Sequence, residues 1–148
     1  EVLTFEICHA LGLSHIKSFS GGTESTAFNH RMVKALTDSG HDLKAISNGT
    51  NPHYTITAGD KTKECFSKKY DDPFNPQNDF IAITVCSDAE QNCPLVFGAK
   101  SRFHLPYLDP KAFDDTDLEE TKYREKLEEI NAELSYVFGQ YKSRMVNG

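Results

Sequence analysis

Residues 80–94 read FIAITVCSDAEQNCP and join a short apolar run to a polar segment that holds two cysteines. The apolar run, residues 80–85, is rich in isoleucine and valine and is typical of a buried β-strand. Cys86 follows at or just past the C-terminal end of this predicted strand, and Cys93 comes seven positions later. In open α/β folds this edge of the sheet is where sites form.

The spacing of the two cysteines leaves two interpretations open. A polar turn with several helix formers can bring Cys86 and Cys93 close enough to exchange a disulfide. The same spacing also fits two structural cysteines, of which one is buried and the other caps a loop. The rest of the chain has to decide between a reactive pair and two structural thiols.

Length and charge exclude several classes of protein. The chain has 148 residues, a formal net charge of −6 and a sequence pI near 5.5. This length predicts a single domain over residues 1–148. No cluster of lysine and arginine is available to neutralise several phosphates, so we expect no nucleic-acid partner. No apolar stretch approaches a membrane span and no signal peptide is visible, so we expect neither membrane insertion nor secretion.

Cysteine usage predicts a cytoplasmic protein. The four cysteines, Cys8, Cys65, Cys86 and Cys93, occur in a chain long enough to fold without disulfides. Without a secretory signal the expected compartment is reducing, where cysteines are reactive, metal-binding or buried. The six histidines are scattered, and none shares a close metal-ligand spacing with two cysteines, so we expect no metal and no cofactor.

Local patterns predict regular elements in the first half of the chain. They are a helix over 1–11 without a cap or lead-in, a strand over 16–20 that ends at Gly21 and Gly22, a helix from about Ser25 with Gly40 as its left-handed cap, and hairpin strands at 54–57 and 64–66. Residues 71–76 contain two prolines and an asparagine, which indicates a loop.

The last third of the chain predicts a strand followed by a long helix. The strand covers about residues 102–107, and Asp109 and Pro110 lie just past its end. Thr116 and Glu119 have the spacing of a capping box, after which apolar residues recur on one helical face up to residue 141. Alternating strands and helices predict an α/β domain with a mainly parallel sheet. Gly21 and Gly22, Cys86 and Asp109 should then meet at one edge of that sheet.

Three short segments carry a resemblance to a known family. Residues 84–94, TVCSDAEQNCP, resemble the redox segment of thioredoxin-coupled arsenate reductases, which have the low-molecular-weight protein tyrosine phosphatase fold. Residues 107–110, YLDP, resemble the loop that supplies the general acid of that superfamily. Residues 19–23, FSGGT, resemble its second strand and the loop that follows. The order and spacing of these pieces fit over most of the chain, whereas residues 47–66 have no counterpart.

The resemblance implies a three-layer fold, with a mainly parallel sheet flanked by helices, and a cysteine relay. A first cysteine, in a Cys-x5-Arg loop between the first strand and the first helix, attacks arsenate. The residue matching Cys86 then attacks that sulfur and releases arsenite, and the one matching Cys93 attacks Cys86, so that thioredoxin can reduce the resulting disulfide. The aspartate matching Asp109 protonates the leaving oxygen.

The sequence departs from the family at the nucleophile. A Cys-x5-Arg loop needs an arginine six positions after a cysteine, and the four cysteines have Ser14, Asp71, Asn92 and Ala99 there. In the family this loop directly precedes the helix with which the present chain opens. We therefore expect the first strand and the nucleophile loop to be missing, either because the chain is incomplete upstream, which we favour, or because it is a catalytically dead remnant.

Two further functions stay open beside arsenate reduction. Within the same fold, the chain can belong to a phosphatase that hydrolyses phosphotyrosine, with Cys86 and Cys93 only protecting the nucleophile. Outside enzymes, it can be a binding or regulatory module that has lost its loop. On either alternative Asp109 is also open to a second interpretation, because an aspartate before proline is a common turn former.

Overall fold

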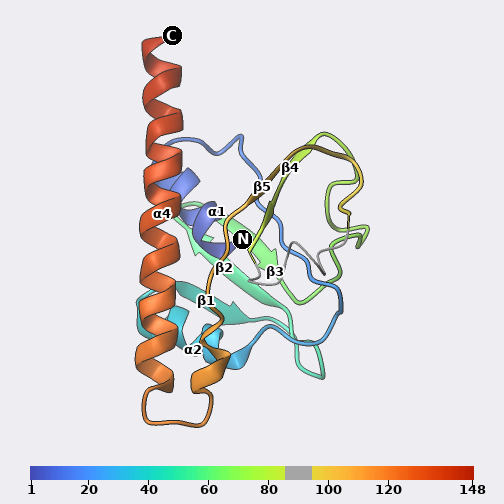
Figure 1. Ribbon diagram of the computed structural model, residues 1–148, viewed down its shortest axis with the longest axis vertical. Helices are drawn as coiled ribbons and strands as arrows, with labels where there is room; N and C mark the ends of the chain where they lie inside the picture. The colour runs from blue at the N-terminus through green and yellow to red at the C-terminus, as the bar shows by residue number, and fades with distance from the viewer. Residues whose placement is uncertain (86–94) are drawn as a thin grey trace.

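The computed structural model describes residues 1–85 and 95–148, in which two helices are followed by five strands and then by a 3₁₀ helix and a long helix. The predicted alternation of strands and helices is therefore wrong for these residues. In chain order the elements are α1 (Val2–Ala10), α2 (His30–Asp38), β1 (Asp42–Ala45), β2 (Tyr54–Ala58), β3 (Lys61–Cys65), β4 (Phe80–Thr84), β5 (Ala99–His104), the 3₁₀ helix η1 (Pro110–Phe113) and α4 (Glu119–Asn147). The protein is therefore α/β, as the sequence predicts. Figure 1 shows α4 along one side of the molecule, with its C-terminal end extending beyond the rest.

Strands β1, β2 and β3 form an antiparallel sheet in that order. The pairing of Ala58 with Lys61 closes the β2–β3 hairpin over two residues, Gly59 and Asp60. Gly59 has a φ of +59°, which suits the left-handed position of a tight hairpin turn. The predicted hairpin is confirmed, whereas β1, which pairs Asp42 with Thr57, was not predicted.

The second sheet holds only two strands among the described residues, β4 and β5, and they run parallel. Residues 80–84 form β4 as predicted, and β5 lies at 99–104 rather than at 102–107. The prediction of a mainly parallel sheet therefore holds for β4 and β5 alone. The hairpin residues pair antiparallel because a two-residue turn can only return the chain antiparallel to itself.

Two predicted elements near the N-terminus are shorter or absent. Residues 16–20 form no strand, and one isolated parallel bridge joins Gly22 to Lys69. This segment makes polar contacts instead: the Ser18 hydroxyl donates to the carbonyl oxygen of Glu1 at 2.9 Å. The predicted helix from Ser25 begins only at His30, where Asn29 caps the N–H of Arg31.

The start of α4 differs in detail from a capping box. The Glu119 carboxylate accepts the backbone N–H of Asp115 at 2.7 Å, and Thr116 Oγ1 accepts that of Leu118 at 3.3 Å. Both predicted side chains thus satisfy free N–H groups, but α4 starts two residues later than a Thr116 cap requires. Although α4 spans 29 residues, no helix among the described residues is apolar enough over a sufficient length to cross a membrane.

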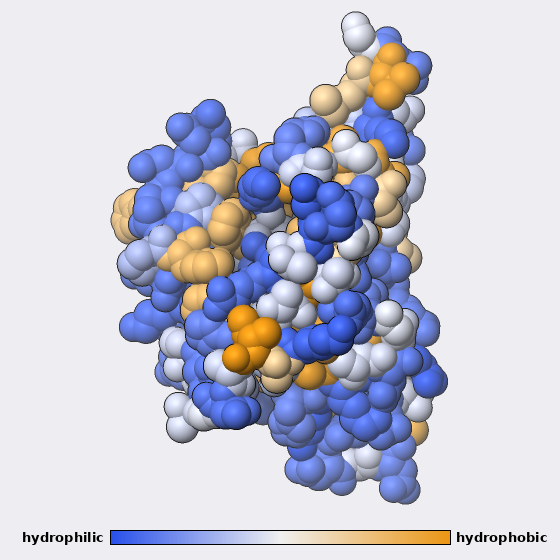
Figure 2. All heavy atoms as spheres, turned by 180° about the vertical axis from the view of Figure 1, so that it is seen from behind, coloured by the Kyte–Doolittle hydropathy of each residue, from blue (hydrophilic) through white to orange (hydrophobic). Residues whose placement is uncertain are grey.

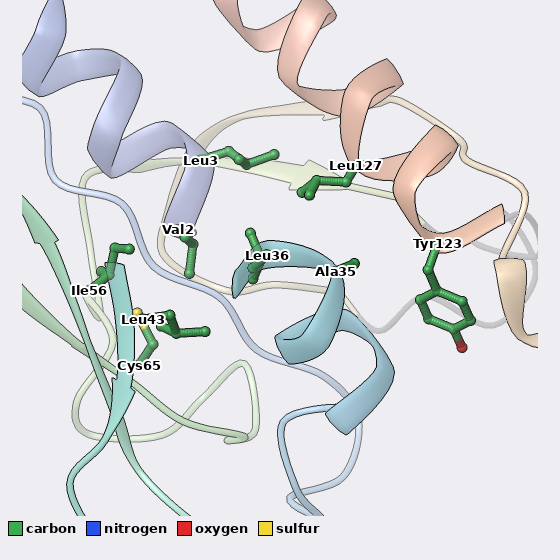
Figure 3. Close-up of a cluster of buried hydrophobic side chains, with 9 residues drawn as sticks. All are labelled: Val2, Leu3, Ala35, Leu36, Leu43, Ile56, Cys65, Tyr123 and Leu127. Atoms are coloured by element: carbon green, nitrogen blue, oxygen red, sulfur yellow. The ribbon is translucent and has the colours of Figure 1, made fainter. Parts of the chain in front are cut away.

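The hydrophobic core lies between the antiparallel sheet and the three α-helices. Figure 3 shows its buried members, which come from both sides of this interface: Val2, Leu3, Ala35, Leu36, Leu43, Ile56, Cys65, Tyr123 and Leu127. Along α4 the apolar face is covered only at first, since Tyr123 and Leu127 are buried whereas Val137 and Tyr141 are 49% and 43% exposed. The predicted packing of the whole α4 face on the core is therefore wrong for its C-terminal half.

Candidate functional site

The C-terminal end of β4 and the segment before Asp109 lie side by side. Leu105 donates its backbone N–H to the carbonyl oxygen of Thr84 at 2.9 Å, and Tyr107 donates to that of Val85 at 3.0 Å. The β4–β5 pairing thus continues past β5 to the residue that directly precedes Cys86 in the chain. Cys86 and Cys93 themselves lie outside the described residues.

Asp109 is exposed and begins the 3₁₀ helix η1. Its Oδ1 accepts the backbone N–H of Lys111 at 2.9 Å, and Pro110 occupies the first helical position. Proline suits that position because its missing N–H has no partner there in any helix. Asp109 therefore offers a solvent-accessible carboxyl group at a fixed backbone position, which general acid catalysis requires.

Tyr107 fixes the chain on the N-terminal side of Asp109. Its hydroxyl donates to the carboxylate of Glu133 on α4, and the ammonium group of Lys126 lies 5.8 Å from the centre of its ring. Burial raises the pKa of Tyr107, and the hydrogen bond to Glu133 raises it further. The phenol therefore stays protonated and keeps donating throughout the neutral range.

Arg31 fixes the chain on the C-terminal side of Asp109. Its Nε lies 2.7 Å from Glu119 Oε2 and 3.6 Å from Asp114 Oδ1, and its Nη2 lies 2.8 Å from Asp115 Oδ1. The hydrogen bond from Arg31 lowers the pKa of Glu119, and the N–H of Asp115 lowers it further. One guanidinium group from α2 thus engages three carboxylates between η1 and α4.

A buried tyrosine joins this ionic cluster to the core. The hydroxyl of Tyr123, which is 2% exposed, donates to Asp114 Oδ1 at 2.8 Å and accepts from Asn29 Nδ2 at 3.4 Å. The sequence indicated only a capping box at Thr116 and Glu119 and gave Arg31 no role. The excess of acidic residues there was the available signal, but a cation distant in sequence has to be placed by the fold.

Gly21 and Gly22 lie beside a different part of the chain. Gly22 exchanges backbone hydrogen bonds with Lys68 and Tyr70 at 2.9 Å each. A Cβ atom at Gly21 would lie 2.4 Å from the Cα of Tyr70, so only glycine fits this approach. No hydrogen bond joins the two glycines to Thr84, Val85 or Asp109 within residues 1–85 and 95–148. The expected meeting of Gly21 and Gly22 with Asp109 is therefore not supported by any contact.

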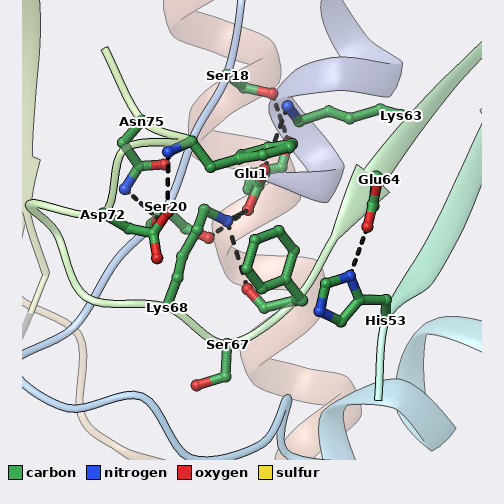
Figure 4. A network of polar contacts seen from close by, with 12 residues as sticks. Glu1, Ser18, Ser20, His53, Lys63, Glu64, Ser67, Lys68, Asp72 and Asn75 are labelled. Carbon is green, nitrogen blue, oxygen red and sulfur yellow. Dashed lines mark hydrogen bonds and ion pairs between the residues drawn. The ribbon is translucent and has the colours of Figure 1, made fainter. Parts of the chain in front are cut away.

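A buried ionic cluster lies next to these glycines. Figure 4 shows Lys68 and Lys63 directed at the Glu1 carboxylate, with an N–O distance of 3.2 Å for each. The side chain of Lys68 is fully buried, and its Nζ also lies 4.6 Å from the centre of the Phe66 ring. Both ammonium groups are thus engaged by the protein itself, which suits a structural role better than oxyanion binding.

Two of the four cysteines are buried free thiols. Cys8 and Cys65 are each 1% exposed. Burial raises the pKa of both thiols, and that of Cys65 reaches about 11. Because the thiolate is the nucleophile, both residues are poorly suited to attack an oxyanion or a disulfide at neutral pH.

A hollow on the described part of the chain is separate from Asp109. It has a volume of about 430 Å³ and lies among α1, α2, α4 and the segments at 20–29 and 65–68. Its lining is largely apolar, with Phe28, Met32, Ile130 and Leu134 among its members, and includes none of residues 105–119. The described residues also contain no cluster of three or more histidine, cysteine, aspartate or glutamate residues able to hold a metal ion.

Comparison with known proteins gives one consistent result. No family model matches the chain. Two curated proteins named "Arsenate reductase 2" and "Arsenate reductase", from two strains of Staphylococcus epidermidis, are each 29% identical to it over 92 residues. The chain is similar to arsenate reductases. The match covers 62% of the present chain and 55% of each relative, so the chain spans about half the length of the curated relatives it matches.

Proposed function

We propose that this chain belongs to an enzyme that reduces arsenate to arsenite through a disulfide relay between Cys86 and Cys93. The similarity to arsenate reductases supports the enzyme class. The observation that carries the proposal is the backbone pairing of Tyr107 with Val85, because it brings the Asp109 segment alongside the residue that precedes Cys86. A proton donor and a thiol are the two groups that the chemistry needs close together.

The proposed reaction moves two electrons from thiols to arsenic. A first cysteine thiolate displaces one oxygen of arsenate as water, and Asp109 supplies the proton. The Cys86 thiolate then attacks the sulfur of that cysteine, so that the As–S electron pair stays on arsenic and arsenite leaves. Cys93 attacks Cys86 and frees the first cysteine, and thioredoxin, as the expected partner in the cytoplasm, reduces the Cys86–Cys93 disulfide.

The first cysteine is proposed to lie upstream of Glu1. Neither Cys8 nor Cys65 suits the role, because both are buried and their pKa values are raised. A preceding strand and its Cys-x5-Arg loop would extend the parallel pair β4–β5 towards the three-layer fold of the family. The exposure of Ile81 and Phe103, 63% and 55%, supports this, because parallel sheets are normally covered on both faces.

The test uses the protein expressed together with its upstream coding sequence. With thioredoxin and its reductant, wild-type protein should convert arsenate to arsenite continuously, whereas Cys93→Ser should stop after one turnover. Cys65→Ser is the matched control, since it removes a buried thiol with no place in the relay, and it should keep turning over. Continuous turnover by Cys93→Ser would rule out the relay.

A second candidate function is hydrolysis of phosphotyrosine. The same position of Asp109 favours it, because a general acid beside the strand end serves an aryl phosphate as well as arsenate. Steady hydrolysis of an aryl phosphate without any thiol reductant, unaffected by Cys86→Ser, would support the phosphatase. An upstream coding sequence without a Cys-x5-Arg loop would instead favour a non-catalytic binding module.

A further inference from the structure

The segment around Asp109 is held at both ends by residues of other elements. On the N-terminal side, Tyr107 bonds to the backbone of Val85 and to the carboxylate of Glu133. On the C-terminal side, Arg31 binds the three carboxylates of Asp114, Asp115 and Glu119. Between these two anchors the chain consists of Leu108, Asp109 and the single turn η1.

We propose that Arg31 is a positioning residue for Asp109, holding the far end of η1 so that the Asp109 carboxyl group stays beside the end of β4. This inference rests on the proposed function, in which Asp109 is the general acid. Arg31 itself does not touch the reacting atoms. It holds Asp114, and the position of Asp114 fixes η1 and with it Asp109. These five residues, 110–114, span about 10 Å at the rise of a 3₁₀ helix.

The charge balance of the cluster explains why Arg31 carries this role. Asp114, Asp115 and Glu119 lie within a stretch of six residues. Their carboxylates repel one another, and this repulsion would separate the end of η1 from the start of α4 unless a cation lay between them. Arg31 is the cation that contacts all three among the described residues. Its Nε and Nη2 bind different carboxylates from fixed positions on one planar group, a geometry that the rotatable ammonium group of lysine does not fix.

The structure provides a matched control for a purely structural ion pair. Lys34 lies on the same helix, pairs with Asp38, and reaches across to Glu120 of α4 at 3.0 Å. It therefore joins α2 to α4 as Arg31 does, but it contacts none of the residues between η1 and Glu119. Lys34→Met removes an α2–α4 ion pair and leaves the Asp109 segment untouched.

The first measurement is backbone dynamics in the chain of 148 residues, which does not depend on activity. In Arg31→Met, the NMR order parameters of the amides of residues 111–115 should fall from the rigid value of about 0.85 towards 0.6. In Lys34→Met they should stay at the rigid value. Unchanged order parameters in Arg31→Met would overturn the proposal, whatever the enzyme does.

The second measurement is turnover of the protein expressed with its upstream coding sequence. Loss of a positioned general acid lowers the rate by about 10²- to 10⁴-fold. Asp109→Asn should lower kcat by this amount, which is the largest effect that loss of positioning can have. Arg31→Met should lower kcat by about 10- to 100-fold at unchanged KM for the oxyanion, since a shift of the acid by about 1 Å has an effect of that size. Lys34→Met should keep wild-type kcat.

A double-mutant cycle separates positioning from general loss of structure. If Arg31 acts through Asp109, the Arg31→Met, Asp109→Asn double variant should be no slower than Asp109→Asn alone. If the double variant instead loses kcat by the product of the two single losses, Arg31 does not act through Asp109, although Asp109 can still be the general acid. Wild-type kcat in Asp109→Asn would contradict the proposed function itself, and the role of Arg31 with it. Should Arg31→Met not fold, Tyr107→Phe removes the bond to Glu133 at the other anchor, keeps the backbone bond to Val85, and should give the same non-additive pattern with Asp109→Asn.

Discussion

In the antiparallel sheet Ile56 of β2 has no exposed surface, whereas in the parallel pair Ile81 of β4 is 63% exposed. Ile56 belongs to a buried cluster whose members come from three helices and three strands, whereas β4 contributes only Ala82 to the buried hydrophobic residues. Figure 2 shows apolar side chains reaching the surface on the side of the molecule formed by β4 and β5. The candidate site therefore lies on the less covered of the two sheets.

This difference follows from how the two sheets are connected. A two-residue turn joins β2 to β3, so the strands of this sheet are close in sequence, and α1, α2 and α4 supply the rest of its core. Parallel strands need a long crossover and are normally covered on both faces. The described residues supply this cover for the antiparallel sheet only, which leaves the β4–β5 side as the place where further chain or a partner is expected to pack.

The largest expected effect comes from truncating the same residue type in the two sheets. Ile56→Ala should lower the free energy of unfolding by about 3 kcal/mol, because it leaves a cavity in a packed core. Ile81→Ala should lower it by less than about 0.5 kcal/mol, because its side chain is mostly in water already. Urea denaturation monitored by circular dichroism measures both values. Equal losses would show that β4 is as well packed as β2.

Thiol reactivity provides the next contrast. The raised pKa of Cys65, about 11, leaves its thiolate roughly 100-fold scarcer at pH 8 than that of an ordinary cysteine. Cys65 should therefore be alkylated at least that much more slowly in the folded protein than in urea, and burial should slow the alkylation of Cys8 in the same direction. Peptide mapping after timed alkylation measures the rate at each site. Cys86 and Cys93 should be the faster pair, and rapid labelling of Cys65 in the folded protein would contradict its burial.

A smaller effect is expected at the junction between the core and the Arg31 cluster. Tyr123→Phe removes the hydroxyl that donates to Asp114, and should cost about 1 kcal/mol of unfolding free energy. Tyr136→Phe is the matched control on the same helix, since Tyr136 is 69% exposed. Urea midpoints compare the two variants. A loss as large in Tyr136→Phe would mean that the bond to Asp114 adds nothing.

The smallest expected effect is a pH dependence at the start of α4. The pKa of Glu119 is lower in the folded than in the unfolded protein, chiefly through Arg31, so the unfolded state binds more protons near pH 4. Its stabilising contribution is present above about pH 4.3, the usual carboxyl pKa, and is lost as the pH falls through the lower folded value. Glu119→Gln should therefore give a shallower loss of the urea midpoint in acid than wild type does.

The control for this pH dependence is Glu128→Gln. Glu128 is exposed on α4 and forms no ion pair within the part of the chain that the structure describes. In Glu128→Gln the urea midpoint should fall with decreasing pH as steeply as in wild type. A matching change in both variants would assign the effect to the net charge of α4 rather than to the bond with Arg31.

Local features of the fold were predictable where neighbouring residues determine them. Gly40 has the expected left-handed φ, +89°, and the hairpin around Gly59 forms as its turn residues indicate. Long-range pairing was not predictable in the same way. Residues 16–20 were predicted to form a short strand, but the structure gives them polar partners such as Glu1 instead of a neighbouring strand.

In the candidate site, too, local features were predictable from the sequence and long-range contacts were not. The position of Asp109 beyond a strand end was visible in the sequence, because Asp-Pro marks the end of an element. The role of Arg31 was not, since 84 positions separate it from Asp115 and only the packing of α2 on α4 brings them together. Cys86 and Cys93 were identified from their spacing and a family resemblance, and their place in the fold lies outside the described residues.

The most direct test of the relay is the state of its two thiols after reaction with arsenate. The protein with its upstream coding sequence is reduced, freed of reductant, exposed to arsenate without thioredoxin, alkylated and mapped by mass spectrometry. The account predicts arsenite in an amount equal to the protein, with Cys86 and Cys93 joined by a disulfide and Cys8 and Cys65 still free. Arsenite formation that leaves Cys86 and Cys93 open to alkylation would contradict it, as would the absence of arsenite.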